Sequence, residues 1–442
     1  MIRKLIALIG TVALSHSIAS VSLYVNPGNP VLIEKQTQTT LLQIRLEGAD
    51  RTPERADRLP VNLSVVIDRS GSMSGDRMEQ AKEAARTVVN MLGSQDIFSL
   101  VTYSDEAETL IPATKLTDRA AALRAIDAIY SDGNTALFAG VSKGLAEVRK
   151  FKMRNRVNRV ILLSDGQANV GPSNPSELGD LGRSAGRSGI GVTTIGLGLG
   201  YNEDLMSQLA MASDGNHAFA ENSSDLARIF QQEIGGVLSV VAQSIEIIIQ
   251  CPSGVRPIRI LDQDAEIRGQ SVHLNYNQIY GRQNKTLLLE VEVSGKREGQ
   301  SMELASVQVG YDDPASGRRE NISGNAQVRF TASQAVVKRE VYKPAVVEAA
   351  KARGNMASKK ALELRDKGDF AGAGAVMQQN AKDMEAQATS LDIPELAKES
   401  DNAKAEAAIL SAPAPAEELN KSRKELKAKQ YERSSQFSIQ KK

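Results

Sequence analysis

The amino-acid sequence predicts a doubly wound α/β domain with a mostly parallel sheet, an antiparallel β-sandwich domain and a C-terminal helical segment. Three patterns along the 442 residues predict these parts. Residues 57–236 alternate apolar, strand-length runs with amphipathic helices, which is typical of a parallel sheet covered on both faces. Residues 237–332 alternate apolar and polar positions with period two, as half-exposed antiparallel strands do. Residues 333–411 are rich in alanine and have helical spacing.

The first residues are predicted to direct export. Arg3 and Lys4 precede a mostly apolar run over 5–14, and Ser17-Ile18-Ala19 has small residues at both ends. Such a segment is typical of a secretory signal peptide, cleaved here after Ala19. The run is too short for an ordinary membrane-spanning helix, and no later stretch of about 20 apolar residues follows. We therefore expect a signal peptide at 1–19 and no transmembrane segment beyond it; an uncleaved anchor is the alternative.

Residues 20–56 are predicted to hold one or two strands and a linker. Leu42, Ile44 and Leu46 alternate with polar residues, and the charged stretch that follows contains Pro53. We expect these strands to have no partners of their own. We therefore predict that they join the sandwich at 237–332, so that the α/β domain at 57–236 is an insertion into that sandwich.

Within the α/β domain, apolar runs predict strands at 61–67, 97–103, 157–163 and 190–197. Helical spacing predicts helices at 77–92, 118–129, 135–151, 203–211 and 225–237. In such a fold the functional site lies outside the carboxyl ends of the strands. Further along, residues 333–411 are predicted to be helical. The tail at 412–442 is predicted to be a solvated charged helix or disordered, since 416–442 holds eight Lys or Arg and four Asp or Glu.

The composition excludes several functions. There are 54 Lys and Arg residues against 53 Asp and Glu, and a formal net charge of +1 argues against wholesale nucleic-acid binding. His217 and His273 are the histidines left after removal of the signal peptide, too few for a three-histidine zinc site. Cys251 is the single cysteine, so no intrachain disulfide forms; together with export, this favours a bacterial periplasm or exterior. No nucleotide-binding P-loop motif occurs, and no nucleophile-elbow motif surrounds Ser70 or Ser72, so we expect no enzymatic activity.

Three separated motifs form the candidate site. Asp68, Ser70 and Ser72 directly follow the first strand of the α/β domain, Thr135 opens a helix, and Asp165 follows another strand. Each motif alone is commonly a surface turn, a helix cap or a loop. Together, at converging strand ends, they supply three neutral hydroxyl oxygens and two carboxylates. Oxygen ligands of this kind suit Mg²⁺. With so few direct carboxylates, the ion would accept another carboxylate in an open position.

These motifs resemble the von Willebrand factor type A family. Its metal-ion-dependent adhesion site has the pattern Asp-x-Ser-x-Ser, a distant Thr and a distant Asp, which falls on the five residues above without substitution. The segments 161–166 and 194–198 are also similar to that family. Within it, the chain looks most like inter-alpha-trypsin inhibitor heavy chains and bacterial relatives of calcium-activated chloride channel regulators. The resemblance covers 57–236 and implies that Asp68, Ser70, Ser72, Thr135 and Asp165 bind Mg²⁺, Mn²⁺ or Ca²⁺.

The sequence thus predicts an exported, periplasmic or secreted, non-enzymatic protein. A protein partner would supply an Asp or Glu side chain that completes the metal shell. The alternative is a scaffold or assembly factor of a cell-envelope complex in which the metal has a structural role. These two hypotheses differ in whether the open metal position faces solvent or is covered by this chain.

Overall fold

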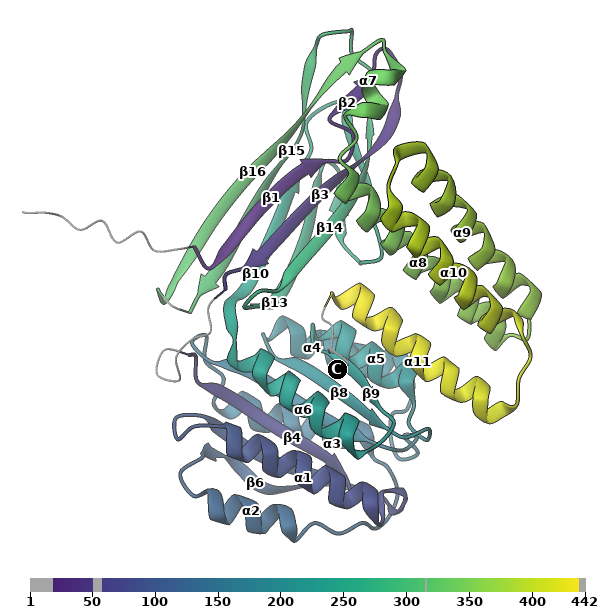
Figure 1. Ribbon diagram of the computed structural model, residues 1–442. Coiled ribbons are helices and arrows are strands. Elements are labelled where there is room, and N and C mark those ends of the chain that lie inside the picture. Colours follow the sequence, from purple (N-terminus) through teal and green to yellow (C-terminus); the bar gives the residue numbers. More distant parts are fainter. Residues whose placement is uncertain (1–18, 51–57, 315, 437–442) are drawn as a thin grey trace, which may run out of the picture.

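The computed structural model describes residues 19–50, 58–314 and 316–436. They form an α/β domain, a β-sandwich and a layer of helices (Figure 1). The predicted fold class is confirmed in all three parts. The predicted signal peptide, apart from Ala19, lies outside the described residues, as does most of the predicted linker.

The α/β domain is built on a six-stranded sheet. Its strands are β4 (Val61–Asp68), β5 (Ile97–Tyr103), β6 (Ala107–Lys115), β7 (Val157–Ser164), β8 (Gly191–Leu197) and β9 (His217–Ala220). They lie in the order β6-β5-β4-β7-β8-β9, and every neighbouring pair is parallel except β5 with β6. The strands β4, β5, β7 and β8 are buried along their whole length, which explains why they appear in the sequence as continuous apolar runs.

Helices cover both faces of this sheet (Figure 1). The six helices are α1 (Asp76–Met91), α2 (Arg119–Asp127), α3 (Leu137–Lys150), α4 (Pro175–Arg187), α5 (Glu203–Ala212) and α6 (Ser223–Leu238). Apolar residues of α1, α2 and α6 share one core with the sheet, and those of α3, α4 and α5 share another. This two-faced burial is the doubly wound arrangement that the sequence predicted.

The sandwich consists of two antiparallel sheets, one of which also carries a short parallel strand. One sheet has the order β1 (Val21–Pro27), β3 (Gln38–Gly48), β14 (Asn284–Val293) and β11 (Val255–Ile260). The other has the order β12 (Glu266–Arg268), β13 (Ser271–Tyr280), β10 (Val240–Gln250), β15 (Ser301–Asp313), β16 (Arg318–Thr331) and β2 (Val31–Ile33), with β2 parallel to β16. The strand β3 pairs with β14, with Ile44 opposite Leu287. The predicted pairing of the N-terminal strand with the sandwich is therefore present.

The chain leaves and re-enters the sandwich at one place. The turn after β13 contacts both crossing points: Gly281 N donates to Ser239 O at 2.8 Å, and Arg282 N donates to Gly48 O at 3.1 Å. Tyr280, at the end of β13, packs into a core cluster of the α/β domain. The junction is therefore a packed contact as well as a pair of chain connections.

The helical layer follows the sandwich. It comprises α7 (Gln334–Arg339), α8 (Lys343–Asp366), α9 (Phe370–Leu391), α10 (Pro394–Ser411) and α11 (Ala416–Ser435). Ala349 of α8 packs against Leu261 and Leu288 on the outer face of the sandwich. The helices α8, α9 and α10 pack on one another through small residues and a few larger apolar side chains.

Where the structure describes it, the predicted charged tail forms a helix, α11, with one side buried and the other exposed to solvent. The helix α11 lies against the α/β domain beside α5 and β9 (Figure 1). The Lys424 side chain is only 2% exposed, and its Nζ donates to Glu203 Oε2 at 2.5 Å and to Tyr201 O at 2.6 Å. Arg423 pairs with Asp204 at 2.7 Å and also with Glu203. Burial favours a raised pKa for the Glu203 carboxyl, but hydrogen bonds from Lys424 and Arg423 hold its pKa below the ordinary value.

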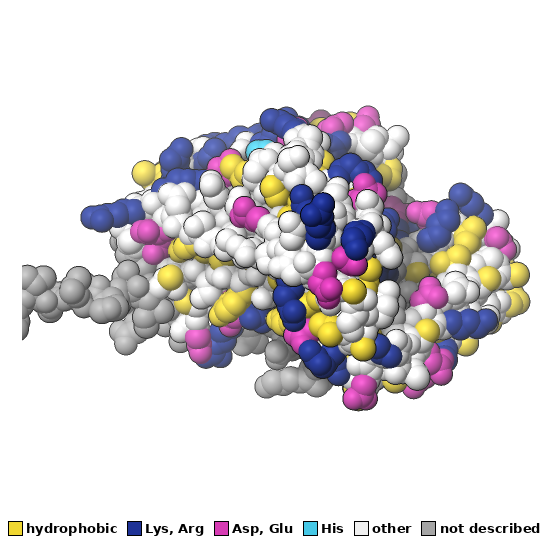
Figure 2. Space-filling view, turned by 90° about the horizontal axis from the view of Figure 1, so that it is seen from above, with side chains coloured by type: hydrophobic (Ala, Val, Ile, Leu, Met, Phe, Trp, Pro, Cys, Tyr) yellow, Lys and Arg dark blue, Asp and Glu magenta, His cyan; other side chains and the backbone are white. Residues whose placement is uncertain are grey.

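The face of the molecule shown in Figure 2 carries charged side chains of both signs. Lys and Arg side chains are interspersed there with Asp and Glu, in keeping with the formal net charge of +1. Among the helices that the structure describes, none combines the length and the apolar character needed to cross a bilayer.

Removing the Lys424 charge should loosen α11 from the α/β domain. We expect Lys424→Met to lower the free energy of unfolding by about 2 kcal/mol, because the buried Glu203 carboxylate loses one of its two cationic partners. Urea unfolding gives this change, and limited proteolysis reports release of the helix. Lys421→Met is the matched control, since Lys421 pairs with Glu221 on the exposed surface and should change stability little. If both variants change the free energy of unfolding equally, the buried Lys424–Glu203 pair does not hold α11 in place.

The buried histidine of β9 predicts a loss of stability in acid. Burial lowers the pKa of His217 to about 4, whereas an unfolded histidine has a pKa of about 6.5. Between these values the unfolded chain binds the extra proton, so stability should fall as pH drops from about 6.5 to 4, by on the order of 2–3 kcal/mol. His217→Phe keeps a ring among Tyr201 and Tyr431 and should flatten this part of the curve. If the free energy of unfolding depends on pH in the same way in both proteins, His217 does not cause the loss of stability in acid.

Candidate metal centre

All five predicted site residues lie at one edge of the α/β sheet. Asp68 is the last residue of β4, Asp165 follows β7, and Thr135 lies just before α3. Two backbone hydrogen bonds join the loop of the serines to the loop that carries Thr135: Gly71 N donates to Gly133 O at 2.9 Å, and Asp132 N donates to Arg69 O at 2.7 Å. Strand order explains the convergence, because β4 and β7 are parallel neighbours and end at the same edge.

The Asp68 carboxylate is fully buried and organises this edge. Its Oδ1 accepts from Ser70 N at 2.9 Å, and its Oδ2 accepts from Ser164 Oγ at 2.7 Å and from Tyr103 OH at 3.3 Å. Burial raises the pKa of Asp68, while hydrogen bonds from Ser70 and Ser164 oppose that rise and the charge of Asp165 adds to it. Burial beside Asp68 also raises the pKa of the Tyr103 phenol, so this hydroxyl acts as a donor to the carboxylate.

The three hydroxyls lie beside the second carboxylate. Ser70 Oγ and Ser72 Oγ are 3.1 Å apart, and Ser72 Oγ donates to Asp165 Oδ1 at 2.7 Å. A β-carbon placed on Gly166 would lie 3.2 Å from Thr135 Oγ1 and 3.6 Å from Ser72 Oγ. Ser70, Ser72 and Asp165 therefore form a continuous chain of contacts. The hydroxyls of Thr135 and Ser72 both lie next to Gly166.

Asp165 is also held by a basic residue. Arg77, in the first turn of α1, donates from Nη1 to Asp165 Oδ2 at 2.7 Å and to Ser72 O at 3.1 Å. The Asp165 side chain has no exposed surface, whereas 45% of the Arg77 side chain is exposed. Each carboxylate oxygen of Asp165 thus accepts one hydrogen bond from this chain.

Two glycines shape the supporting loops. Gly133 has a φ of +78°, and a β-carbon there would lie 2.3 Å from Asp105 Oδ2. Gly200, in the loop after β8, lies so close to the Asp165 carbonyl that a β-carbon would be 2.5 Å from its oxygen. Asn420 of α11 donates to Leu199 O in that same loop at 3.0 Å. Glycine at these two positions therefore allows the close approach of Asp105 to the Thr135 loop and of the loop after β8 to the Asp165 backbone.

This donor set fits a hard divalent cation. Neighbouring ligand oxygens of an octahedral Mg²⁺ ion lie about 3.0 Å apart, given metal–oxygen distances of about 2.1 Å, and the two serine hydroxyls have that spacing. Serine and threonine hydroxyls would bind the ion, and the two aspartates would supply negative charge directly or through water. In the described ranges no three His, Cys, Asp or Glu side chains group as metal ligands, so a site at this edge depends on the hydroxyls.

Sequence reasoning missed three residues of this edge. Tyr103 is opposite Asp68 in the β4–β5 register, Ser164 ends β7 next to Asp165, and Arg77 lies one turn beyond the serines. Ser164 and Tyr103 could have been found, because both are polar residues at the carboxyl ends of strands that neighbour β4. Nothing in the sequence indicates that Arg77 turns toward Asp165.

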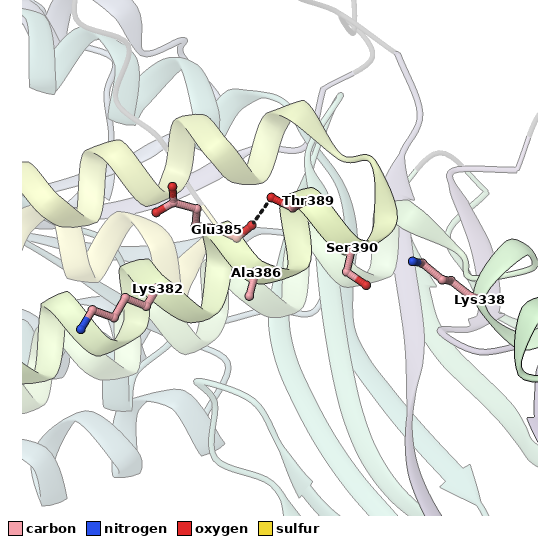
Figure 3. Close-up of a pocket in the computed structure, with 6 residues that line it drawn as sticks. All are labelled: Lys338, Lys382, Glu385, Ala386, Thr389 and Ser390. Atoms are coloured by element: carbon pink, nitrogen blue, oxygen red, sulfur yellow. Dashed lines mark hydrogen bonds between the residues drawn. The ribbon is translucent and has the colours of Figure 1, made fainter.

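Other candidate features lie elsewhere. His217 Nδ1 is 2.9 Å from Thr194 Oγ1 inside the domain, and Cys251 is buried with its pKa raised to about 11 by burial. An open hollow of about 650 Å³ lies between α7 and α9 (Figure 3). Its walls are exposed or half-buried side chains of both charges, including Lys338, Lys382 and Glu385. None of these features contributes to the edge around Asp68.

Comparison with known proteins places the α/β domain in a family. Residues 62–232 match the von Willebrand factor type A domain. The uncharacterized protein sll0103 of Synechocystis sp. is 27% identical over 360 residues, which cover 78% of this chain and 83% of that protein. The human inter-alpha-trypsin inhibitor heavy chain H2 is 31% identical over 196 residues, covering 41% of this chain and 20% of that protein.

Solved structures share the fold over most of the chain. The von Willebrand factor type A protein from Catenulispora acidiphila has a TM-score of 0.71 at 16% identity, covering 90% of this chain and 92% of that one. The ArnB paralog VWA2 from Sulfolobus acidocaldarius has a TM-score of 0.60 at 18% identity, covering 92% and 98%. Domains of this family commonly mediate protein–protein interactions and often bind a divalent metal ion. The chain therefore contains a von Willebrand factor type A domain, set within a sandwich and a helical layer.

Proposed function

We propose that this protein is an exported protein-binding protein whose contact with its partner depends on a divalent cation. Asp68, Ser70, Ser72, Thr135 and Asp165 would hold Mg²⁺, or Mn²⁺ or Ca²⁺ in its place. An Asp or Glu side chain of the partner would complete the metal shell. The observation that carries this proposal is the meeting of three hydroxyls and two carboxylates, from three separate segments, at one sheet edge.

The accessibility of this edge favours binding of a partner over a purely structural metal. Ser72 is exposed, as are Gly71 and Gly133 beside it, whereas Asp68 and Thr135 are buried beneath them. An ion held by these side chains would therefore have an open side toward solvent. A scaffold role with a structural metal remains the alternative, and it requires that partner binding survive removal of the ion.

The proposal is for binding without catalysis. The serines donate to or contact other oxygens of the site, and His217, on the edge strand β9, is engaged with Thr194 of β8. A nucleophilic serine needs a base within hydrogen-bond reach, and the described partners of Ser70 and Ser72 are a hydroxyl and a carboxylate that already pairs with Arg77. The export part of the proposal rests on the sequence of residues 1–19.

A hydroxyl deletion tests metal binding with little disturbance of the fold. We expect Mg²⁺ or Mn²⁺ at millimolar concentration to raise the melting temperature of the wild type relative to chelator, because an ion at about 100 times its Kd stabilises the folded state by about 2.7 kcal/mol. Thr135→Val keeps the side-chain shape and should lose most of that shift. Thr114→Val, on the exposed edge strand β6, is the control and should keep it.

Asp68→Ala is a harsher variant of the same test. It should also abolish the metal-dependent shift, but it removes the acceptor of Ser70 N, Ser164 Oγ and Tyr103 OH. The stability of Asp68→Ala in chelator should therefore fall as well, whereas that of Thr135→Val should change little. Identical melting of the wild type in saturating metal and in chelator would remove the basis for metal binding.

Partner capture should depend on the same ion. We expect immobilised wild-type protein to retain an envelope protein in Mg²⁺ and to release it on chelation, and we expect Thr135→Val to retain little of it. Mass spectrometry of the chelator eluate identifies the retained protein, and Thr114→Val controls for non-specific retention. Capture of the same protein in chelator and in Mg²⁺ would support the scaffold alternative instead.

A further inference from the structure

The position of Arg77 is unusual for a cation. It is the second residue of α1, where the helix macrodipole presents partial positive charge, and its first-turn neighbours Asp76 and Glu79 are acidic. A basic side chain in a first turn is unfavourable for the helix itself. Its compensation is the ion pair with Asp165, at 2.7 Å. The sequence thus departs from a local helix rule at a residue that reaches into the candidate site.

The Arg77 guanidinium is bound to the site but not packed into it. Nη1 donates both to Asp165 Oδ2 and to Ser72 O, yet 45% of the side chain is exposed. Asp165 in contrast is fully buried and contributes to the negative charge that a divalent ion would need. The side chain can therefore leave Asp165 by rotating into solvent, without opening the apolar core.

We propose that Arg77 is a tethered cation that competes with the divalent ion for Asp165, so that the incoming carboxylate of a partner strengthens metal binding. This inference rests on the proposed metal-dependent function. A divalent ion near Asp165 and a guanidinium on the same carboxylate repel each other, which weakens binding of the ion alone. A bound partner carboxylate adds a negative charge, and the exposed guanidinium forms a charge-assisted hydrogen bond with it. Arg77 thus weakens binding of the ion alone and strengthens binding of the ion together with a carboxylate.

The coupling can be measured with Mn²⁺ and acetate as probes. Isothermal titration gives the Kd of Mn²⁺ with and without acetate, for the wild type, Arg77→Gln and Arg77→Lys. We expect Arg77→Gln to bind Mn²⁺ alone on the order of tenfold more tightly than the wild type, and acetate to improve the Kd less in Arg77→Gln than in the wild type. Arg77→Lys keeps the charge and should resemble the wild type more than the glutamine variant does.

A second arginine of the same helix provides the matched control. Arg86 pairs with Glu83 and Asp127 on the outer side of α1, so Arg86→Gln makes the same change in net charge away from Asp165. It should leave the Kd of Mn²⁺ unchanged. Circular dichroism in chelator verifies that each variant keeps its fold. If Arg77→Gln does not fold, Arg77→Lys is compared with the wild type instead.

The outcomes distinguish this inference from the proposed function. If the wild type binds Mn²⁺ and Arg77→Gln binds it equally or more weakly, Arg77 positions Asp165 instead of competing with the ion, and the inference is overturned while the metal site stands. An equal gain from acetate in all three proteins overturns the coupling. If neither the wild type nor Arg77→Gln binds Mn²⁺, both the inference and the proposed function fail.

Discussion

The buried carboxylate of Asp68 is the constraint on which the site depends. A carboxylate without solvent contact is stable only when its oxygens are hydrogen-bonded, and this one is bonded to the loop after β4, to β5 and to β7. Those bonds fix the serine loop relative to its neighbouring strands. The site is therefore positioned by the same interactions that close the carboxyl edge of the sheet, and the metal would add to an arrangement already present.

The rest of the chain holds the domain rather than forming the site. The sandwich contacts the α/β domain at its junction, where the side chain of Asp214 accepts from Asn277 N at 2.6 Å and Tyr280 bonds to the buried Arg159. The helix α11 binds the domain through Lys424 and Arg423, and its Asn420 contacts the loop that backs Asp165. Further along α11, Tyr431 OH donates to Gly215 O at 2.8 Å, next to Asp214 at the junction. The helix therefore extends from the loops of the site to the contact with the sandwich.

Much of this structure could be predicted because burial leaves periodic patterns. The fully buried strands β4, β5, β7 and β8 and the alternating strands of the sandwich were predicted for that reason. The edge strand β6 was missed, since it is half-exposed and contains Pro112. The helix α4 was missed because glycines interrupt it; Gly182 lies so close to α5 that a β-carbon would be 2.6 Å from Leu209 O.

The ionic contacts were harder to predict than the fold. The helix α11 has no apolar stripe, and its attachment depends on Arg423 and Lys424 meeting acidic residues more than 200 positions earlier. The five site residues could be predicted because strand ends converge in this fold. The contact between Arg77 and Asp165 could not, because it depends on the direction of one long side chain at the start of α1.

The side-by-side crossing points at Gly48 and Ser239 lead us to expect a particular order of folding. The strand β3 must find β14, which lies more than 230 residues later in the sequence, and closing so long a flexible loop carries a large entropic cost. The inserted α/β domain has apolar cores of its own, so we expect it to fold as a unit before the sandwich closes. Once folded, it brings its two ends to the same turn, so the sandwich strands meet across a short span instead of a long disordered one.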